Sequence, residues 1–105
     1  MKGLQKLKTI NENGVLTVML SGEIDHHSAG STREKIDMLI TKNRPQNLVL
    51  DFSEVSFMDS SGVGLVMGRY NHSKAIGCKT AVTGLKARDK KIMLMSGLAK
   101  LVEFR

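Results

Sequence analysis

The stretch that is most informative about the fold of this chain is a junction between a predicted strand and a predicted helix, Phe57-Met58-Asp59-Ser60-Ser61-Gly62-Val63-Gly64. Upstream, the apolar run at residues 48–52 predicts a buried strand. Downstream, apolar side chains recur at the spacing of one helix face, at Val63, Val66, Met67 and Tyr70. Two serines therefore stand where a loop becomes a helix. That end of a helix favours negative charge, because its first backbone N–H groups lack intrahelical partners.

A serine at the start of a helix has two interpretations. Ser is a favoured N-cap residue, and this role alone accounts for either Ser60 or Ser61. A phosphate attached there would be stabilised by the same N–H groups, which is the chemistry of a regulatory switch. Position alone leaves both serines open as caps and leaves phosphorylation compatible with either.

Outward from this junction, the chain alternates between strand and helix patterns. Asn13-Gly14 predicts a two-residue hairpin turn. Strands are expected at about residues 4–10, 15–20, 48–52, 78–83 and 101–104. Helices are expected at about residues 26–41, 61–75 and 85–95. The order ββαβαβαβ predicts a single α/β domain over residues 1–105, with a mixed β-sheet and helices packed on it.

The first helix has two candidate starts. Asp25 can cap a helix that begins at His26. Gly30 weakens the first turns of such a helix. A later start at Ser31, with Ser31 and Glu34 as a capping box, therefore stays open.

The composition is that of an ordinary globular domain, with 41% apolar and 25% charged residues in 105. No segment approaches the run of about twenty apolar residues that spans a bilayer, and the N-terminus has no apolar signal-peptide core. The single cysteine, Cys78, excludes an internal disulfide and fits a reducing compartment. We expect a cytoplasmic protein with no membrane association.

The net charge of +6 raises the possibility of nucleic-acid binding. One Tyr, three Phe and no Trp provide no base-stacking platform, however. A solvated helix face, or a surface complementary to an acidic protein, is the better interpretation of the basic residues. The one dense basic cluster, interrupted by Asp89, consists of Lys86, Arg88, Lys90 and Lys91.

The glycines after the junction do not form a nucleotide-binding motif. Gly62, Gly64 and Gly68 lack the third-glycine spacing of the dinucleotide fingerprint, and no Gly-Lys-Ser/Thr sequence is present. We interpret them as small residues that let the helix lie close to the sheet.

The sequence contains neither the residue spacing of a metal site nor the motif of a serine hydrolase. His26 and His27 are adjacent, so on a helix they do not share a ligand face, and His72 is distant in sequence. Neither a metal nor a cofactor is expected. The surroundings of Ser60 are not a G-x-S-x-G elbow. A small serine hydrolase using Ser60 stays open as an alternative, because triads are defined by geometry.

Four separated segments resemble the anti-sigma factor antagonists of the STAS-domain family, and among them the sporulation branch most closely. In chain order they are Gly22-Glu23-Ile24-Asp25-His26-His27-Ser28-Ala29, then residues 57–65, then Gly68-Arg69-Tyr70, then Met95-Ser96-Gly97-Leu98. The resemblance covers nearly the whole chain. One departure is that the chain stops at Arg105, so the C-terminal helix common in the family is expected to be missing.

The resemblance implies a non-enzymatic partner switch that regulates sporulation transcription. The unphosphorylated protein would bind an anti-sigma factor that is also a serine kinase, and so free a sigma factor. The kinase would use ATP to phosphorylate Ser60, and a serine phosphatase would reset the switch. The domain would act as a monomer or weak dimer, without direct nucleic-acid binding. A STAS subunit of a stress-response switch is the alternative within the family.

The same resemblance assigns roles to the residues near Ser60. Asp25 falls on the acidic residue beside the phosphorylation site, and Ser61 falls on the second motif serine, a cap rather than the acceptor. The expected partner-binding residues around the phosphosite are Asp25, His26, Asp59, Ser61 and Gly62.

Overall fold

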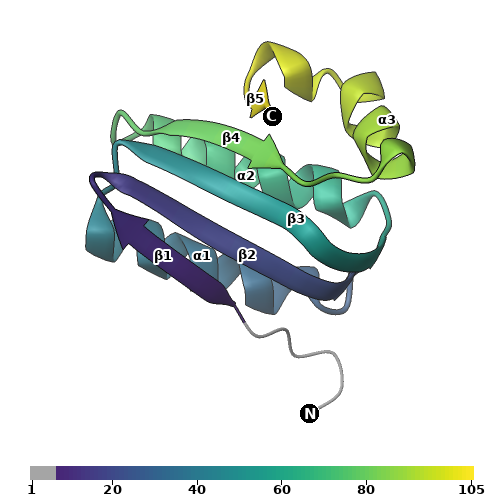
Figure 1. The fold of residues 1–105 in the computed structure, drawn as a ribbon, viewed down its shortest axis with the longest axis horizontal. Helices are drawn as coiled ribbons and strands as arrows, with labels where there is room; N and C mark the ends of the chain where they lie inside the picture. The colour runs from purple at the N-terminus through teal and green to yellow at the C-terminus, as the bar shows by residue number, and fades with distance from the viewer. Residues whose placement is uncertain (1–6) are drawn as a thin grey trace.

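A hairpin opens the described part of the chain, residues 7–105, in this computed structural model (Figure 1). Strand β1 (Lys8–Glu12) pairs antiparallel with β2 (Val15–Ile24). Asn13 and Gly14 between them have positive φ angles of 53° and 79°. The hairpin prediction is confirmed, because these residue types tolerate that conformation. Of the first strand predicted at residues 4–10, residues 4–6 lie outside the described residues, and the observed strand continues to Glu12.

The remaining strands run parallel to β2. The sheet order is β1-β2-β3-β4-β5, so the five-stranded sheet is mixed and the predicted order ββαβαβαβ is confirmed. A 3₁₀ turn, η1 (Leu98–Lys100), precedes the last strand. The N–H groups of Leu101 and Val102 donate back to the Leu98 carbonyl, so the last strand begins at Glu103 and is shorter than predicted. These parallel strands are β3 (Asn47–Met58), β4 (Lys79–Thr83) and β5 (Glu103–Phe104).

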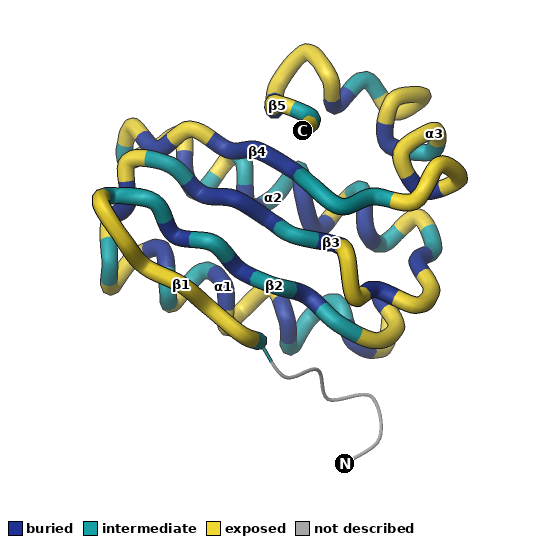
Figure 2. Tube along the Cα trace, in the orientation of Figure 1, coloured by how far each residue is buried: buried dark blue, intermediate teal, exposed yellow. Residues whose placement is uncertain are grey.

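Two helices cover one face of the sheet. Helices α1 (Ala29–Asn43) and α2 (Ser61–Lys74) lie behind β2, β3 and β4 in Figure 1. The third helix, α3 (Ala87–Met95), lies beyond the β4 edge. Apolar side chains of the sheet and of both covering helices form the core, while β1 is exposed along its length (Figure 2). Fully buried members of the core include Leu16, Leu50, Ile36, Ile40 and Val66.

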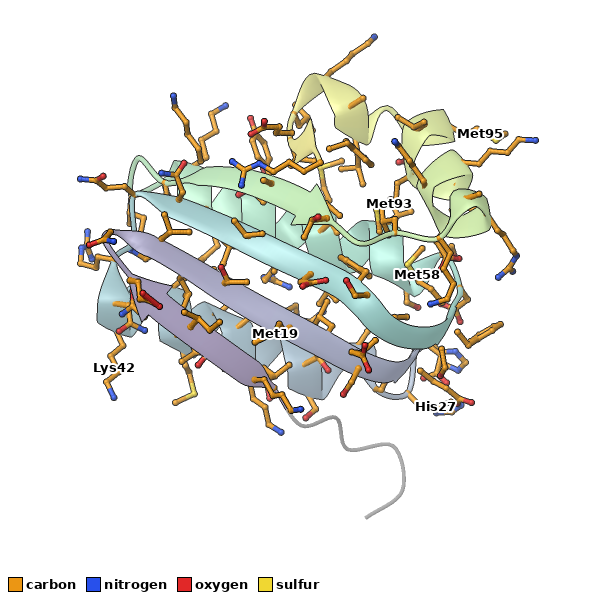
Figure 3. All side chains as sticks on the ribbon, viewed as in Figure 1. Met19, His27, Lys42, Met58, Met93 and Met95 are labelled. Carbon is orange, nitrogen blue, oxygen red and sulfur yellow. The ribbon has the colours of Figure 1, made fainter. Side chains whose placement is uncertain are left out.

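Strand β3 is more than twice as long as predicted. Its pairing with β4 ends at Asp51 and Thr83, but its pairing with β2 continues, with register shifts, as far as Ile24 and Met58. Residues 53–57 are mostly exposed and break the apolar pattern of the strand. This part of β3 is extended because it pairs with β2. The ends of β2 and β3 therefore project beyond β4, where Figure 3 shows His27 and Met58.

Candidate functional site: two adjoining turns

Two turns meet at the carboxyl ends of β2 and β3. We call residues 25–28 the Asp25 turn and residues 59–61 the Ser60 turn. Ile24 pairs with Met58, and the Asp59 N–H donates to the Ile24 carbonyl at 3.1 Å. The two turns therefore lie side by side, each leading into one of the covering helices. The structure thus brings Asp25 next to Ser60, although the two are 35 positions apart in the sequence.

Asp59, and not a serine, caps the start of α2. Asp59 Oδ1 accepts the Ser61 N–H at 2.8 Å, and the Asp59 carbonyl accepts the Gly62 N–H at 3.0 Å. Ser60 occupies the N-cap position, but its hydroxyl makes no capping bond. The expectation that Ser60 or Ser61 caps the helix is wrong, since Ser61 is already the first residue of α2. The Ser60 backbone is helical (φ −62°, ψ −14°), whereas a capping side chain requires an extended N-cap residue.

The N–H groups at the start of α2 are consequently already occupied. Asp59 holds those of Ser61 and Gly62, and the Ser60 carbonyl accepts the Val63 N–H at 3.1 Å. A second anion at this turn finds no free donor among them. The expected stabilisation of a phosphate by these groups would require Asp59 to release the Ser61 N–H, and it stays a prediction. The Ser60 side chain is left exposed beside the Asp59 carboxylate.

The Asp25 turn is held by reciprocal hydrogen bonds. Asp25 Oδ1 accepts the N–H groups of His27 and Ser28 at 2.9 and 3.0 Å. Ser28 Oγ in turn accepts the Asp25 N–H at 3.2 Å and donates to the Glu23 carbonyl at 2.9 Å. The Ser28 backbone bond is the largest cause that lowers the pKa of Asp25, and burial opposes it. The carboxylate thus stays ionised at neutral pH.

Helix α1 begins between the two predicted starts. It starts at Ala29, with Ser28 at the N-cap position, because Asp25 caps the preceding turn and not the helix itself. The start predicted at His26 is three residues early. The start predicted at Ser31 is two residues late, and Ser31 already lies inside the helix.

Replacing Asp25 by Ala should loosen the Asp25 turn. The substitution removes the acceptor for two backbone N–H groups, so hydrogen exchange of the His27 and Ser28 amides should speed up. In the native protein the pKa of Asp25 is below its ordinary value of 3.8. The stabilisation of the turn by the Asp25 carboxylate is therefore complete above pH 3.8. It is lost as the pH falls through the lowered pKa. Asp25→Asn keeps an oxygen acceptor and should remove this pH dependence; unchanged exchange in Asp25→Ala would contradict the assignment.

The close-packing interpretation of the glycines holds for one of three. A Cβ on Gly62 would lie 2.2 Å from Met58 Sδ and 2.5 Å from Met58 Cγ, so this glycine does let α2 begin against β3. A Cβ on Gly64 or Gly68 would meet nothing within 4 Å. At these two positions the interpretation is wrong, because the space beside each glycine is open.

A groove separates the starts of the two covering helices, with a volume of about 350 Å³. One wall includes His26, Gly30 and Arg33, and the other includes Ser61, Gly64 and Leu65. We call this the interhelix groove. Sequence reasoning selected Ser61 and His26 but missed Arg33 and the groove itself. The sequence feature that could have indicated the groove is a glycine near the start of each helix, Gly30 in α1 and Gly64 in α2.

The histidine pair lies in the Asp25 turn and not on a helix. The ring centres of His26 and His27 are 4.0 Å apart. Both residues are exposed. Within residues 7–105, no group of three His, Cys, Asp or Glu side chains is placed to hold a metal ion.

An ion pair between buried Arg69 and half-buried Asp37 joins α1 to α2. Arg69 Nε lies 2.6 Å from Asp37 Oδ1, and the Arg69 side chain is almost fully buried. Burial lowers the pKa of Arg69, and the Asp37 carboxylate acts in the opposite direction. Arg69 belongs to one of the segments on which the family resemblance rests. Through its contact with Asp37, Arg69 holds together the two helices whose starts form the interhelix groove.

Part of the basic cluster has a structural role. Lys86 Nζ donates to the Val55 carbonyl, and the Arg88 guanidinium lies 5.8 Å from the centre of the Phe57 ring. These contacts hold α3 against the projecting end of β3. Phe57 remains 43% exposed, two residues before the Ser60 turn. Lys90 and Lys91 are exposed, as the prediction of a solvated or partner-facing surface requires.

The fold and the site define a small α/β binding domain with an exposed serine on a strand-to-helix turn. None of its described helices has the length and apolar character needed to cross a membrane. The sequence profile of the STAS domain matches residues 6–105. This chain belongs to the STAS domain family, among its anti-sigma factor antagonists.

The chain is similar in sequence to two kinds of protein, anti-sigma F factor antagonists and anti-sigma-B factor antagonists. The chain is 37% identical over 92 residues to the anti-sigma F factor antagonist of Paenibacillus polymyxa, covering 88% of this chain and 79% of that protein. It is 31% identical over 93 residues to the anti-sigma-B factor antagonist of Bacillus subtilis, covering 89% and 83% respectively.

Two solved structures named SpoIIAA, one unphosphorylated and one phosphorylated, are similar to this chain. The anti-sigma factor antagonist SpoIIAA in its unphosphorylated form has a TM-score of 0.79 and 31% identity, over 96% of this chain and 87% of that one. The Bacillus SpoIIAA in the phosphorylated form has a TM-score of 0.72 and 31% identity, over 96% and 90%. The antagonists of this family are regulatory binding proteins and not enzymes. The alternative of a small hydrolase using Ser60 is therefore wrong.

Proposed function

We propose that this protein, in its unphosphorylated form, binds an anti-sigma factor that is also a serine kinase, and thereby frees a sigma factor. ATP-dependent phosphorylation of Ser60 switches this binding off, and a serine phosphatase restores it. The observation that carries the proposal is the exposed Ser60 hydroxyl, which takes no part in capping α2. Because sigma factors act on the chromosome, the switch operates in the cytoplasm.

Ser60 is the better acceptor of the two motif serines. Its side chain is exposed at the tip of the turn, whereas Ser61 is half-buried and faces the interhelix groove. The N–H of Ser61 is held by Asp59, which ties that residue into the first turn of α2. A kinase can therefore reach Ser60 without opening the helix.

A phosphate on Ser60 changes the surface and not the fold. It adds about −1.5 to −2 charge at neutral pH, beside the Asp59 carboxylate that already occupies the start of α2. Like-charge repulsion and the occupied N–H groups direct the phosphate outward into solvent. A docked partner must then bury or displace this charge. A coupling of about 3 kcal/mol weakens binding more than a hundredfold.

The partner-binding surface includes the two adjoining turns. Asp25 and His26 stand beside Ser60 across the Ile24–Asp59 hydrogen bond. Asp59 and Ser61 set the backbone of the Ser60 turn, and Gly62 lets that turn sit against Met58. A partner that covers Ser60 therefore also contacts the Asp25 turn.

Sporulation control is the first candidate for the process. Greater identity to an anti-sigma F factor antagonist than to an anti-sigma-B factor antagonist favours it. The second candidate is a stress-response switch, which the sigma-B relatives support. Binding measurements with each type of anti-sigma factor from the same genome distinguish the two.

Phosphate mapping tests the acceptor assignment. The protein is incubated with the kinase-type anti-sigma factor of its own genome and ATP, and the phosphate is located by mass spectrometry. We expect one phosphate, on Ser60, that is absent in Ser60→Ala and retained in Ser61→Ala. Phosphate that persists in Ser60→Ala at the same rate would refute the assignment.

A further inference from the structure

Two helical glycines, Gly30 and Gly64, line the interhelix groove, and no contact within the molecule explains why these positions are glycine. Glycine destabilises a helix relative to alanine, so its presence there calls for a reason. A Cβ on Gly64 would meet no atom within 4 Å, and a Cβ on Gly30 only the Arg33 guanidinium at 3.9 Å. Both residues lie within helices and not at left-handed positions. Neither packing nor backbone conformation therefore requires glycine at these positions.

The interhelix groove carries an unpaired positive charge. Arg33 is exposed on its wall and forms no ion pair within residues 7–105, because the nearby Asp37 is engaged with Arg69. The charge of Arg33 is close enough to Arg69 to act on the pKa of that residue, in the lowering direction. His26 is exposed on the same wall. The groove thus suits a carboxylate, which an arginine can bind through two parallel hydrogen bonds.

The groove is also continuous with the Ser60 turn. Ser61 lines it and directly follows the proposed acceptor. Leu65, which is almost completely buried, also borders it. A protein that covers Ser60 therefore lies over the mouth of the groove.

We propose that the interhelix groove receives an acidic side chain of the anti-sigma factor, with Arg33 pairing with its carboxylate and Gly64 leaving room for it. This inference rests on the proposed function and deepens it. It also explains the direction of the switch, because a phosphate on Ser60 repels a carboxylate that enters the groove next to it.

Alanine at Gly64 tests the steric part, and Gly68 provides a matched control. Both glycines lie in α2 and both have open space at the Cβ position, but Gly68 does not line the groove. Both Gly64→Ala and Gly68→Ala should raise Tm by about 2 to 8 °C, because alanine favours the helix. Only Gly64→Ala should weaken binding of the anti-sigma factor, by at least tenfold in calorimetry.

Neutralising Arg33 tests the charge. Arg33→Gln should weaken binding about tenfold and reduce its dependence on salt concentration, because a charge-assisted pair is lost. Lys42→Gln is the control, since Lys42 is an exposed cation of α1 at the opposite end of the sheet (Figure 3). It should leave both the affinity and its salt dependence unchanged.

The outcomes separate this inference from the proposed function. If the wild type binds the anti-sigma factor and Gly64→Ala binds as tightly as Gly68→Ala, the groove assignment is overturned and the proposed function stands. If the wild type does not bind at all, both fail. If Gly64→Ala instead abolishes self-association in sedimentation while partner binding is unchanged, a second copy occupies the groove and the assignment is overturned.

Discussion

Ser60→Asp is expected to bind the anti-sigma factor at least a hundredfold more weakly than the wild type while keeping its fold. The new carboxylate stands beside Asp59, which already holds the first N–H groups of α2, so it projects toward the partner. A hundredfold loss corresponds to about 2.7 kcal/mol of binding free energy. Titration calorimetry measures the affinity, and circular dichroism checks the fold.

Two other substitutions at Ser60 isolate the charge. Ser60→Asn has nearly the shape of Asp without its charge and should retain most of the affinity. Ser60→Ala should bind normally and stay bound after treatment with the kinase and ATP. Its free energy of unfolding should change by no more than about 0.5 kcal/mol, because the native hydroxyl makes no capping bond. Undiminished binding by Ser60→Asp would count against the switch, and unfolding of Ser60→Ala would reveal a structural residue.

Gly84→Ala should destabilise the fold by about 2 to 5 kcal/mol, from left-handed strain and overpacking together. Gly84 lies in the loop from β4 to α3 with a φ of +77°. An added Cβ would lie 2.4 Å from Ser53 Oγ and 2.7 Å from the Ser53 backbone nitrogen. That nitrogen is fixed, because it donates to Asp51 Oδ1 at 2.8 Å. Neither the loop nor β3 can therefore move aside cheaply.

Gly77→Ala provides the matched control for this prediction. Gly77 follows α2 with a nearly identical φ of +76°, but an added Cβ meets nothing within 4 Å. It should cost only the left-handed strain, about 1 to 2 kcal/mol. Urea denaturation of the two variants gives both free energies of unfolding. Equal losses would mean that the contact with Ser53 is unimportant.

Local patterns were sufficient to predict most of the elements. Asn13-Gly14 forms its turn from its own conformational preferences, and the apolar spacing downstream of Ser60 predicts α2 to within one residue at its end. The second half of β3 was not predictable in this way. Its polar residues carry no strand pattern, and the segment is extended because it pairs with β2.

The candidate site was predicted in part. The exposed serine at a helix start could be located from the sequence, but the capping group could not. Whether the Ser60 hydroxyl caps the helix depends on the backbone angles of Ser60, which the surrounding packing sets. These angles are helical, and Asp59 instead accepts the Ser61 N–H. Arg33 was missed because its role becomes visible only when α1 and α2 are packed together.

The sequence by itself thus determined the order of strands and helices and the position of Ser60, since both follow from short-range preferences of neighbouring residues. Only the tertiary structure decided that Asp59 holds the start of α2, that the Asp25 turn lies beside Ser60, and that a basic groove opens between the helices. The last two of these features join residues far apart in the chain, and the first depends on backbone angles that the surrounding packing sets. Their geometry is set by strand pairing and by the Arg69–Asp37 contact, which no local pattern encodes.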